Sequence, residues 1–257
     1  MKWIPLSKTV HAKKEIKKKE NVDFIKNVTL VQLYNFEIQQ AASYMPIMFV
    51  KNRDLTNICA VLGLSKEQNL FVTADNKWDL FYFPAAFGSY PFRSAKTDDG
   101  KITLLFLEES GLVVDEGLGR PLFKEDGQET EILQHYIRLL TKMERSNAST
   151  SPALSLIEEL ELLKPFKIKV AEASGESHLI DGLFCVDLER FKELEDKDYI
   201  KLRHEHAMEL IYAHLFSLSC FDKLVRRKKS RDRSSESLKD LGTKIFEEKD
   251  EGLNFNF

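Results

Sequence analysis

The sequence predicts an α+β protein with a mainly antiparallel, aromatic-lined sheet, several packed helices and a flexible charged C-terminal tail. Three observations predict this class. Runs of strand length and runs of helical periodicity follow one another without regular β-α-β units. Eighteen phenylalanines in 257 residues indicate an aromatic-rich core. After residue 224 the composition shifts to a segment dominated by charged side chains.

The distribution of charge divides the chain into three parts, although the formal net charge is only −3. Residues 1–20 carry seven basic and two acidic side chains, and residues 224–257 carry nine basic and seven acidic ones. The segment between them is acidic. We therefore expect a Lys-rich flexible arm over 1–23, a single α+β domain over 24–223 and a charged, mostly disordered tail over 224–257.

The first elements of the domain are expected to be short. Alternating apolar residues predict a strand over 28–33. Helical spacing over 36–44 predicts a helix, for which Asn35 is the candidate N-cap. Apolar runs over 46–50 and 58–64 have the length of strands.

An aromatic stretch follows these elements. Residues 73–78 contain an Asp-Asn pair and predict a hairpin turn. Residues 82–92 are dense in aromatics and bracketed by prolines, so we expect a short helix or tight loop packed on the core. A strand is predicted over 102–107, after a turn at 98–100.

Helices dominate the middle of the chain. A long helix is predicted from residue 129 to about 145, because its apolar residues keep to one face. Residues 146–152 are polar and predict a break in the chain. A second helix should then run to residue 163, where Pro165 ends it.

The last part of the domain is expected to pair two strands and to end on helices. The strands are predicted over 166–170 and 179–186, on either side of Ser174-Gly175. Asp187 is expected to cap a helix running to about residue 195. A final long helix is predicted over 207–225.

Cysteine usage and the absence of targeting patterns predict the compartment. Cys59, Cys185 and Cys220 are far apart and lie in apolar runs, which is typical of buried thiols in a reducing environment. The N-terminal sequence lacks the apolar region of a secretory signal, and we expect no transmembrane segment. We expect a cytoplasmic protein, with surface association or signal-less secretion as alternatives.

No residue pattern marks a catalytic or cofactor site. His204, Glu205 and His206 lack the i, i+4 histidine spacing of zinc-binding helices. The pair Gly117 and Gly119 follows no clear strand and precedes no helix directly, which indicates a turn instead of a phosphate cradle. We therefore expect no metal and no cofactor, and catalytic residues remain unknown.

A pocket is conceivable under the aromatic segment 78–92. Its aromatic side chains would line the cavity, and nearby carboxylates or a histidine would supply acid–base groups. The same aromatic pattern is also typical of a core, which is the interpretation we favour. The candidate pocket residues are Trp78, Asp79, Tyr82, Tyr90, Asp187 and His214.

The basic run in the tail is a candidate contact surface. It consists of Arg226, Arg227, Lys228, Lys229, Arg231 and Arg233. It lacks the interleaved aromatics of single-strand binders, and the acidic body would repel a polyanion, so we disfavour nucleic acid and favour a protein partner. Attraction to a membrane surface stays an alternative. Residues 244–257 resemble the uncleaved C-terminal signals of type I secretion substrates.

Six stretches between about residues 24 and 224 carry a family resemblance. They are Ala41 to Phe49; Ala60 to Leu64 with Asn69 to Val72 and Trp78-Asp79; Pro84 to Phe92; Gly117-Leu118-Gly119 with Leu122-Phe123 and Asp126-Gly127; Leu179 to Asp187; and Glu209 to Leu215 with Ser217-Leu218. In this order and spacing they resemble the SapC family of bacterial proteins. Met45 separates Tyr44 from Pro46, where the family usually has Tyr-Pro.

The resemblance implies a role more than a mechanism. The family takes its name from a locus for a paracrystalline surface layer and its export, and no catalytic residue can be carried over from it. We therefore expect a non-enzymatic accessory or interaction protein of surface-layer biogenesis or export, with surface-layer or export components as partners. The alternative is an enzyme of unknown reaction with a pocket near residues 78–92. The partner, any substrate, the oligomeric state and a role of the tail in export stay open.

Overall fold

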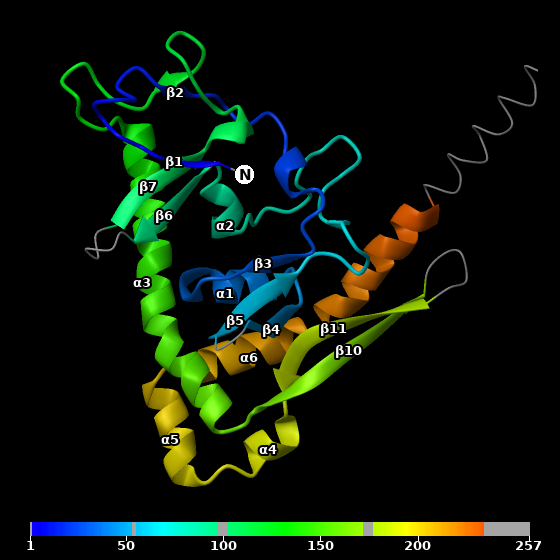
Figure 1. The fold of residues 1–257 in the computed structure, drawn as a ribbon. Coiled ribbons are helices and arrows are strands. Elements are labelled where there is room, and N and C mark those ends of the chain that lie inside the picture. Colours follow the sequence, from blue (N-terminus) through cyan, green and yellow to red (C-terminus); the bar gives the residue numbers. More distant parts are fainter. Residues whose placement is uncertain (1, 53–54, 97–101, 172–176, 234–257) are drawn as a thin grey trace, which may run out of the picture.

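A computed structural model describes residues 2–52, 55–96, 102–171 and 177–233 (Figure 1). It confirms the α+β class, because the described strands form antiparallel sheets on which helices pack. The turns expected at 98–100 and 174–175 lie outside the described residues, as does the part of the tail over 234–257.

A five-stranded sheet forms the centre of the molecule. Its strands, in spatial order, are β10 (Leu163–Ala171), β11 (Ser177–Val186), β4 (Ile47–Asn52), β5 (Leu55–Val61) and β3 (Leu30–Gln32). Every neighbouring pair is antiparallel. The predicted pairing of the strands near 166–170 and 179–186 is confirmed, and both strands extend beyond the predicted bounds.

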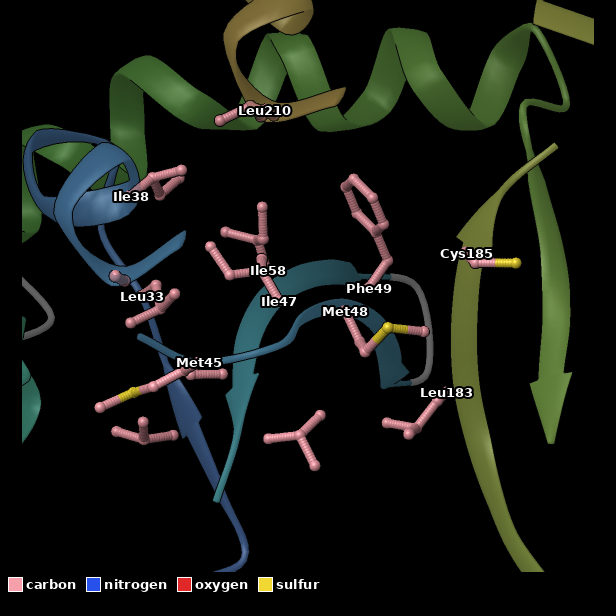
Figure 2. Close-up of a cluster of buried hydrophobic side chains, with 14 of the residues drawn as sticks. Leu33, Ile38, Met45, Ile47, Met48, Phe49, Ile58, Leu183, Cys185 and Leu210 are labelled. Atoms are coloured by element: carbon pink, nitrogen blue, oxygen red, sulfur yellow. The ribbon is translucent and has the colours of Figure 1, made fainter. Parts of the chain in front are cut away.

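Helices pack against this sheet and enclose the main core. They are α1 (Asn35–Ala42), α3 (Glu131–Glu159), α4 (Leu188–Lys192), α5 (Asp196–His204) and α6 (Ala207–Ser217). Figure 2 shows side chains from α1, α6 and strands β4, β5 and β11 meeting in this core. Met45, Ile47 and Phe49 are completely buried there, so the loop into β4 and the strand itself lie at the centre of the apolar packing.

Two smaller sheets lie at the other end of α3 (Figure 1). The first has the order β1-β7-β6, with β1 (Trp3–Pro5), β7 (Ile102–Leu107) and β6 (Phe92–Lys96). The second has the order β8-β2-β9, with β8 (Val113–Val114), β2 (Glu15–Ile16) and β9 (Arg120–Pro121). The remaining helical turns are η1 (Asp23–Ile25), α2 (Ala85–Gly88) and η2 (Glu108–Ser110). A second apolar cluster joins these elements to the first half of α3.

Residues 2–23 of the segment expected to be a flexible arm over 1–23 are part of this folded region. Trp3 pairs with Leu107 across β1 and β7, and Ile16 in β2 is only 1% exposed. Strand pairing satisfies the backbone, and Ile16 buries apolar surface between the lysines. Lys13, Lys17 and Lys18 are exposed on this ordered segment, so the block of like charges does not prevent it from packing.

The two helices predicted on either side of a polar break are one continuous helix, α3, with Pro152 inside it. The predicted break is wrong because the polar side chains of this stretch have hydrogen-bonding partners. The Ser146 hydroxyl accepts a hydrogen bond from the backbone N–H of Asn35, and the Thr150 hydroxyl donates to the Ser146 carbonyl. Both contacts satisfy polar groups within the continuous helix, and the first fastens it to the start of α1.

The start of the tail also differs from the prediction. After a turn at 218–219, a further helix occupies 220–233, so the tail is not disordered from residue 224. Leu224 is fully buried and Lys228 is 4% exposed, four residues apart on the inner face of this helix. Within the described ranges, no helix combines the length and apolar character that a bilayer crossing requires.

Candidate functional site

The aromatic segment 78–92 is packed, as the core interpretation expects. The Trp78 indole N–H donates to the carbonyl of Tyr82 at 2.6 Å. Its ring lies edge-on to Phe83 and Phe87, with centroids 5.3 and 6.0 Å away. Both the polar N–H group and the apolar ring of Trp78 are therefore engaged in contacts within the fold. The segment forms the short helix α2, one of the two alternatives predicted for it.

A carboxylate that sequence reasoning missed holds this segment in place. Glu37 is 5% exposed and lies in the first turn of α1. One of its oxygens accepts from the Tyr82 hydroxyl and from the Ala85 N–H, both at 2.8 Å, and the other accepts from the Tyr34 N–H at 3.2 Å. Burial raises the pKa of Glu37 despite these hydrogen bonds. The carboxylate therefore joins the start of α1 to the aromatic segment.

Tyr90 belongs to a different aromatic group. Its ring stacks on Phe24 with centroids 4.0 Å apart. The amine of Lys19 lies about 6 Å from the rings of Phe24, Tyr90 and Tyr136, and donates to the carbonyl of Gly88 at 3.1 Å. Burial lowers the pKa of Lys19 to about 8. The space between these three rings is therefore already occupied by Lys19 of the same protein.

Asp79 is engaged by the basic run that was expected to be a free tail. The Arg227 guanidinium lies 2.6 Å from the Asp79 carboxylate and 4.9 Å above the Phe71 ring. Arg231 donates to the backbone carbonyls of Asn69 and Val72. These contacts bind the helix over 220–233 to the loop that carries Asp79.

The basic residues of this helix thus fall into two groups. Arg227 and Arg231 contact the body, and Lys228 is buried beside Asp232, its amine 3.1 Å from the carboxylate. The other three are exposed on the outer face of the helix: Arg226, Lys229 and Arg233. A basic contact surface, if used, consists of these three and not of all six.

The candidates Asp187 and His214 both have structural contacts. Asp187 caps α4, as predicted, by accepting from the N–H of Glu189, and lies 3.1 Å from the Lys164 amine. His214 is completely buried. It accepts from the N–H of Val186 at 3.2 Å, so its other nitrogen donates to the Ile47 carbonyl at 2.6 Å. Burial lowers the pKa of His214, which favours this neutral form.

The Gly117-Leu118-Gly119 turn binds an acid from its own chain. Gly117 has a φ of +87°, and the N–H of Gly119 donates to the Glu15 carboxylate at 2.5 Å. Hydrogen bonds from this turn lower the pKa of Glu15. The turn interpretation is confirmed, and the donors that would bind a phosphate are directed at β2.

The six candidate pocket residues do not converge. Trp78 and Tyr82 contact each other, whereas Asp79, Tyr90, Asp187 and His214 are each engaged elsewhere. None of the six lines the hollows found between α1 and α6, beside β2 and beside α3. Among the described residues, no group of three or more His, Cys, Asp or Glu side chains is placed to hold a metal ion. All three cysteines are buried free thiols, and burial raises the pKa of each.

The hollow whose lining best fits a binding site is an open groove between α1 and α6. It has a volume of about 700 Å³, within the usual range of ligand sites. Its walls come from residues 35–43 of α1 and its C-terminal turn, and from residues 209–216 of α6. The groove ends at the first turn of the next helix, where the Cys220 thiol lies 3.5 Å from the Ala42 carbonyl. We call this hollow the α1–α6 groove.

Exposed aromatic side chains line the α1–α6 groove. Phe216 is 73% exposed, Tyr212 39% and Phe36 38%. The rings of Tyr212 and Phe216 stack with centroids 6.0 Å apart, and the Lys142 amine lies 3.9 Å from the centre of the Phe36 ring. Aromatic rings that are fixed in place and partly exposed are the side chains most often found at the centres of protein interfaces.

Polar groups at the edges complete the groove. Gln39, Ser43 and Glu209 line it together with Lys223. Glu209 also lies 3.2 Å from His206, the residue in a left-handed conformation that precedes α6. An apolar floor with hydrogen-bonding groups at its edges is suited to holding an apolar side-chain row of a peptide or helix.

The composition of α6 is the sequence signal that points to this groove. Ala207, Leu210 and His214 face the core, as the helical period predicts. Tyr212 and Phe216, four residues apart, lie on the opposite side, so the helix is apolar on both faces. A helix with that pattern is usually covered on both faces, yet here one side faces the groove.

Comparison with known proteins gives the family. The SapC family model matches residues 6–224, which include both walls of the groove and most of the segment predicted to be a flexible arm. No curated protein and no solved structure gave a match to the chain. Because the match covers most of the described residues in order, the chain belongs to the SapC family.

Proposed function

We propose that this protein is a non-enzymatic accessory protein that binds a component of the bacterial surface layer, or of its export, in the α1–α6 groove. The observation that carries the proposal is the row of exposed aromatics on α6 facing α1. Membership of the SapC family supports the surface-layer part, through the locus from which the family takes its name. We place this binding in the cytoplasm, before the partner leaves the cell.

The chemistry of the groove defines the partner segment. Phe216, Tyr212 and Phe36 offer apolar surface, and burying such surface contributes about 25 cal/mol per Å². A segment with apolar side chains on one face would cover these rings, while its polar groups would meet Gln39 and Ser43 at the edge. The fitting partner is therefore an amphipathic helix or an extended aromatic segment.

The test is a complementation experiment in the source bacterium. The chromosomal copy is deleted, and the strain receives the wild type, Phe216→Ser or the control Phe81→Ser. Phe81 is 100% exposed and lies outside the groove, so the control removes the same side chain from another surface. Surface-layer protein in the envelope is then quantified, and cell fractions show where the accessory protein resides.

The proposal predicts that Phe216→Ser lowers the amount of surface-layer protein in the envelope as deletion does. The Phe81→Ser strain should match the wild type. Equal surface layers in all four strains, including the deletion strain, would refute the surface-layer role. A defect in the deletion strain that both variants restore would refute the role of the groove.

A further inference from the structure

We propose that the α1–α6 groove is regulated by this chain itself: in the absence of a partner, residues 253–257 occupy it. The segment reads Leu253-Asn254-Phe255-Asn256-Phe257. The inference deepens the proposed function, because it supplies the occupant that a partner would displace. Its physical basis is the position of the tether, the chemistry of the segment and the charge along the connecting path.

The tether begins at the groove. Ser219, Cys220 and Lys223 line the groove and belong to the turn and first turn of the helix over 220–233. That helix carries the chain away by about 21 Å, at 1.5 Å per residue. Residues 234–252 then span about 28 Å if helical, or about 63 Å if extended. Either length is enough to bring residues 253–257 back to the groove.

The chemistry of the segment matches the lining. Leu253, Phe255 and Phe257 alternate with asparagines, so an extended segment would present its apolar side chains on one side and its amides on the other. The apolar side would cover the exposed rings of Tyr212 and Phe216. The amides would find hydrogen-bonding partners among the polar side chains at the edge of the groove.

Charge along the path favours the return. The exposed outer face of the helix over 220–233 carries Arg226, Lys229 and Arg233, spaced three and four residues apart. Just before the apolar segment, residues 247–251 hold four acidic side chains and one lysine. An acidic stretch that runs back along a basic helix is attracted to it, and its direction leads toward Lys223 at the groove.

The consequence for partner binding follows from the tether. Tethering a segment to its site through a short linker gives an effective concentration on the order of 1 mM. A segment whose dissociation constant is about ten times smaller than this effective concentration would occupy the groove in about nine molecules of ten. A partner would then bind the full chain about tenfold more weakly than a chain with a disabled segment.

Site-specific photo-crosslinking in the purified full-length chain tests this inference. The photoreactive residue p-benzoylphenylalanine replaces Phe255, and crosslinked peptides are identified by mass spectrometry over a range of protein concentrations. The same probe is placed in Phe216→Ser and Phe81→Ser backgrounds. Both substitutions lie on exposed side chains, so neither should unfold the protein.

The inference predicts crosslinks from position 255 to α1 or α6 within single molecules, independent of concentration. They should be lost in Phe216→Ser and retained in Phe81→Ser. Crosslinks that map elsewhere, that survive Phe216→Ser, or that join only two copies of the chain would overturn it. No partner is present, so the result is independent of the proposed function. Groove crosslinks without surface-layer binding would leave the inference standing and refute that function.

Discussion

Replacing His214 by leucine should destabilise the protein, because two backbone groups lose the hydrogen bonds that the His214 ring makes to them. Leucine has nearly the volume of histidine, so packing changes little. The N–H of Val186 and the carbonyl of Ile47 would be left buried without this side chain. Each unsatisfied group costs about 1–3 kcal/mol, which gives a loss of about 4 kcal/mol in the free energy of unfolding.

The size of this effect should depend on pH. Burial lowers the pKa of His214 below the 6.5 of an exposed histidine. The neutral ring therefore contributes fully above pH 6.5, and its contribution falls as the pH drops toward the folded-state pKa. The gap in stability between wild type and His214→Leu should be widest above pH 6.5 and shrink in acid.

Urea unfolding followed by circular dichroism at several pH values measures this gap. The loss at neutral pH corresponds to a decrease in Tm of about 8–16 °C for a chain of this size. His204→Leu is the control, because His204 is exposed and should change stability by no more than about 0.5 kcal/mol. A loss for His214→Leu as small as that of the control, or a gap that stays constant with pH, would refute the structural role of His214.

Three further predictions concern other buried or docked charges. Burial raises the pKa of Glu37 above the 4.5 of an exposed glutamate, so its contribution to stability is present below pH 4.5 and is lost as the pH rises through the folded-state pKa. Glu37→Gln should therefore gain stability relative to wild type as the pH rises above 4.5 in urea titrations, and a gap that does not change with pH would contradict this. Lys19, whose pKa is lowered to about 8 by burial, should titrate near that pH in NMR, and a midpoint near 10.5 would contradict the burial. Because the unfolded chain takes up a proton at Lys19 before the folded protein does, Lys19→Met should gain stability relative to wild type as the pH falls from 10.5 toward 8. Arg231→Ala should release the helix over 220–233, seen as about 2 kcal/mol less protection in hydrogen exchange, whereas Lys229→Ala on the exposed face should not.

The elements that were predicted well are those that local pattern determines. The paired strands β10 and β11 carry long alternating or apolar runs, and the cap at Asp187 depends on its immediate neighbours. The polar stretch before Pro152 misled the prediction because its hydroxyl groups bond to the helix and to Asn35, which is 111 residues away from Ser146. Local sequence does not contain that information.

The contacts of the candidate site residues also depend on residues that are distant in the sequence. Asp79 was a plausible acid–base group by residue type, but its partner Arg227 lies 148 residues further along the chain. Glu37 lies in an ordinary first helical turn, and only the fold brings Tyr82 and Ala85 to its carboxylate. The groove required knowing which side of α6 meets the core. Tyr212 and Phe216 on the other side were visible in the sequence as an apolar excess.

The central claim is that the α1–α6 groove binds a surface-layer component. Isothermal titration of that purified component into wild type, Phe216→Ser and Phe81→Ser tests it most directly. We predict saturable binding to the wild type and to Phe81→Ser with equal affinity, and binding to Phe216→Ser that is about tenfold weaker or more. Equal affinity of all three proteins, or no binding to any of them, would contradict the claim.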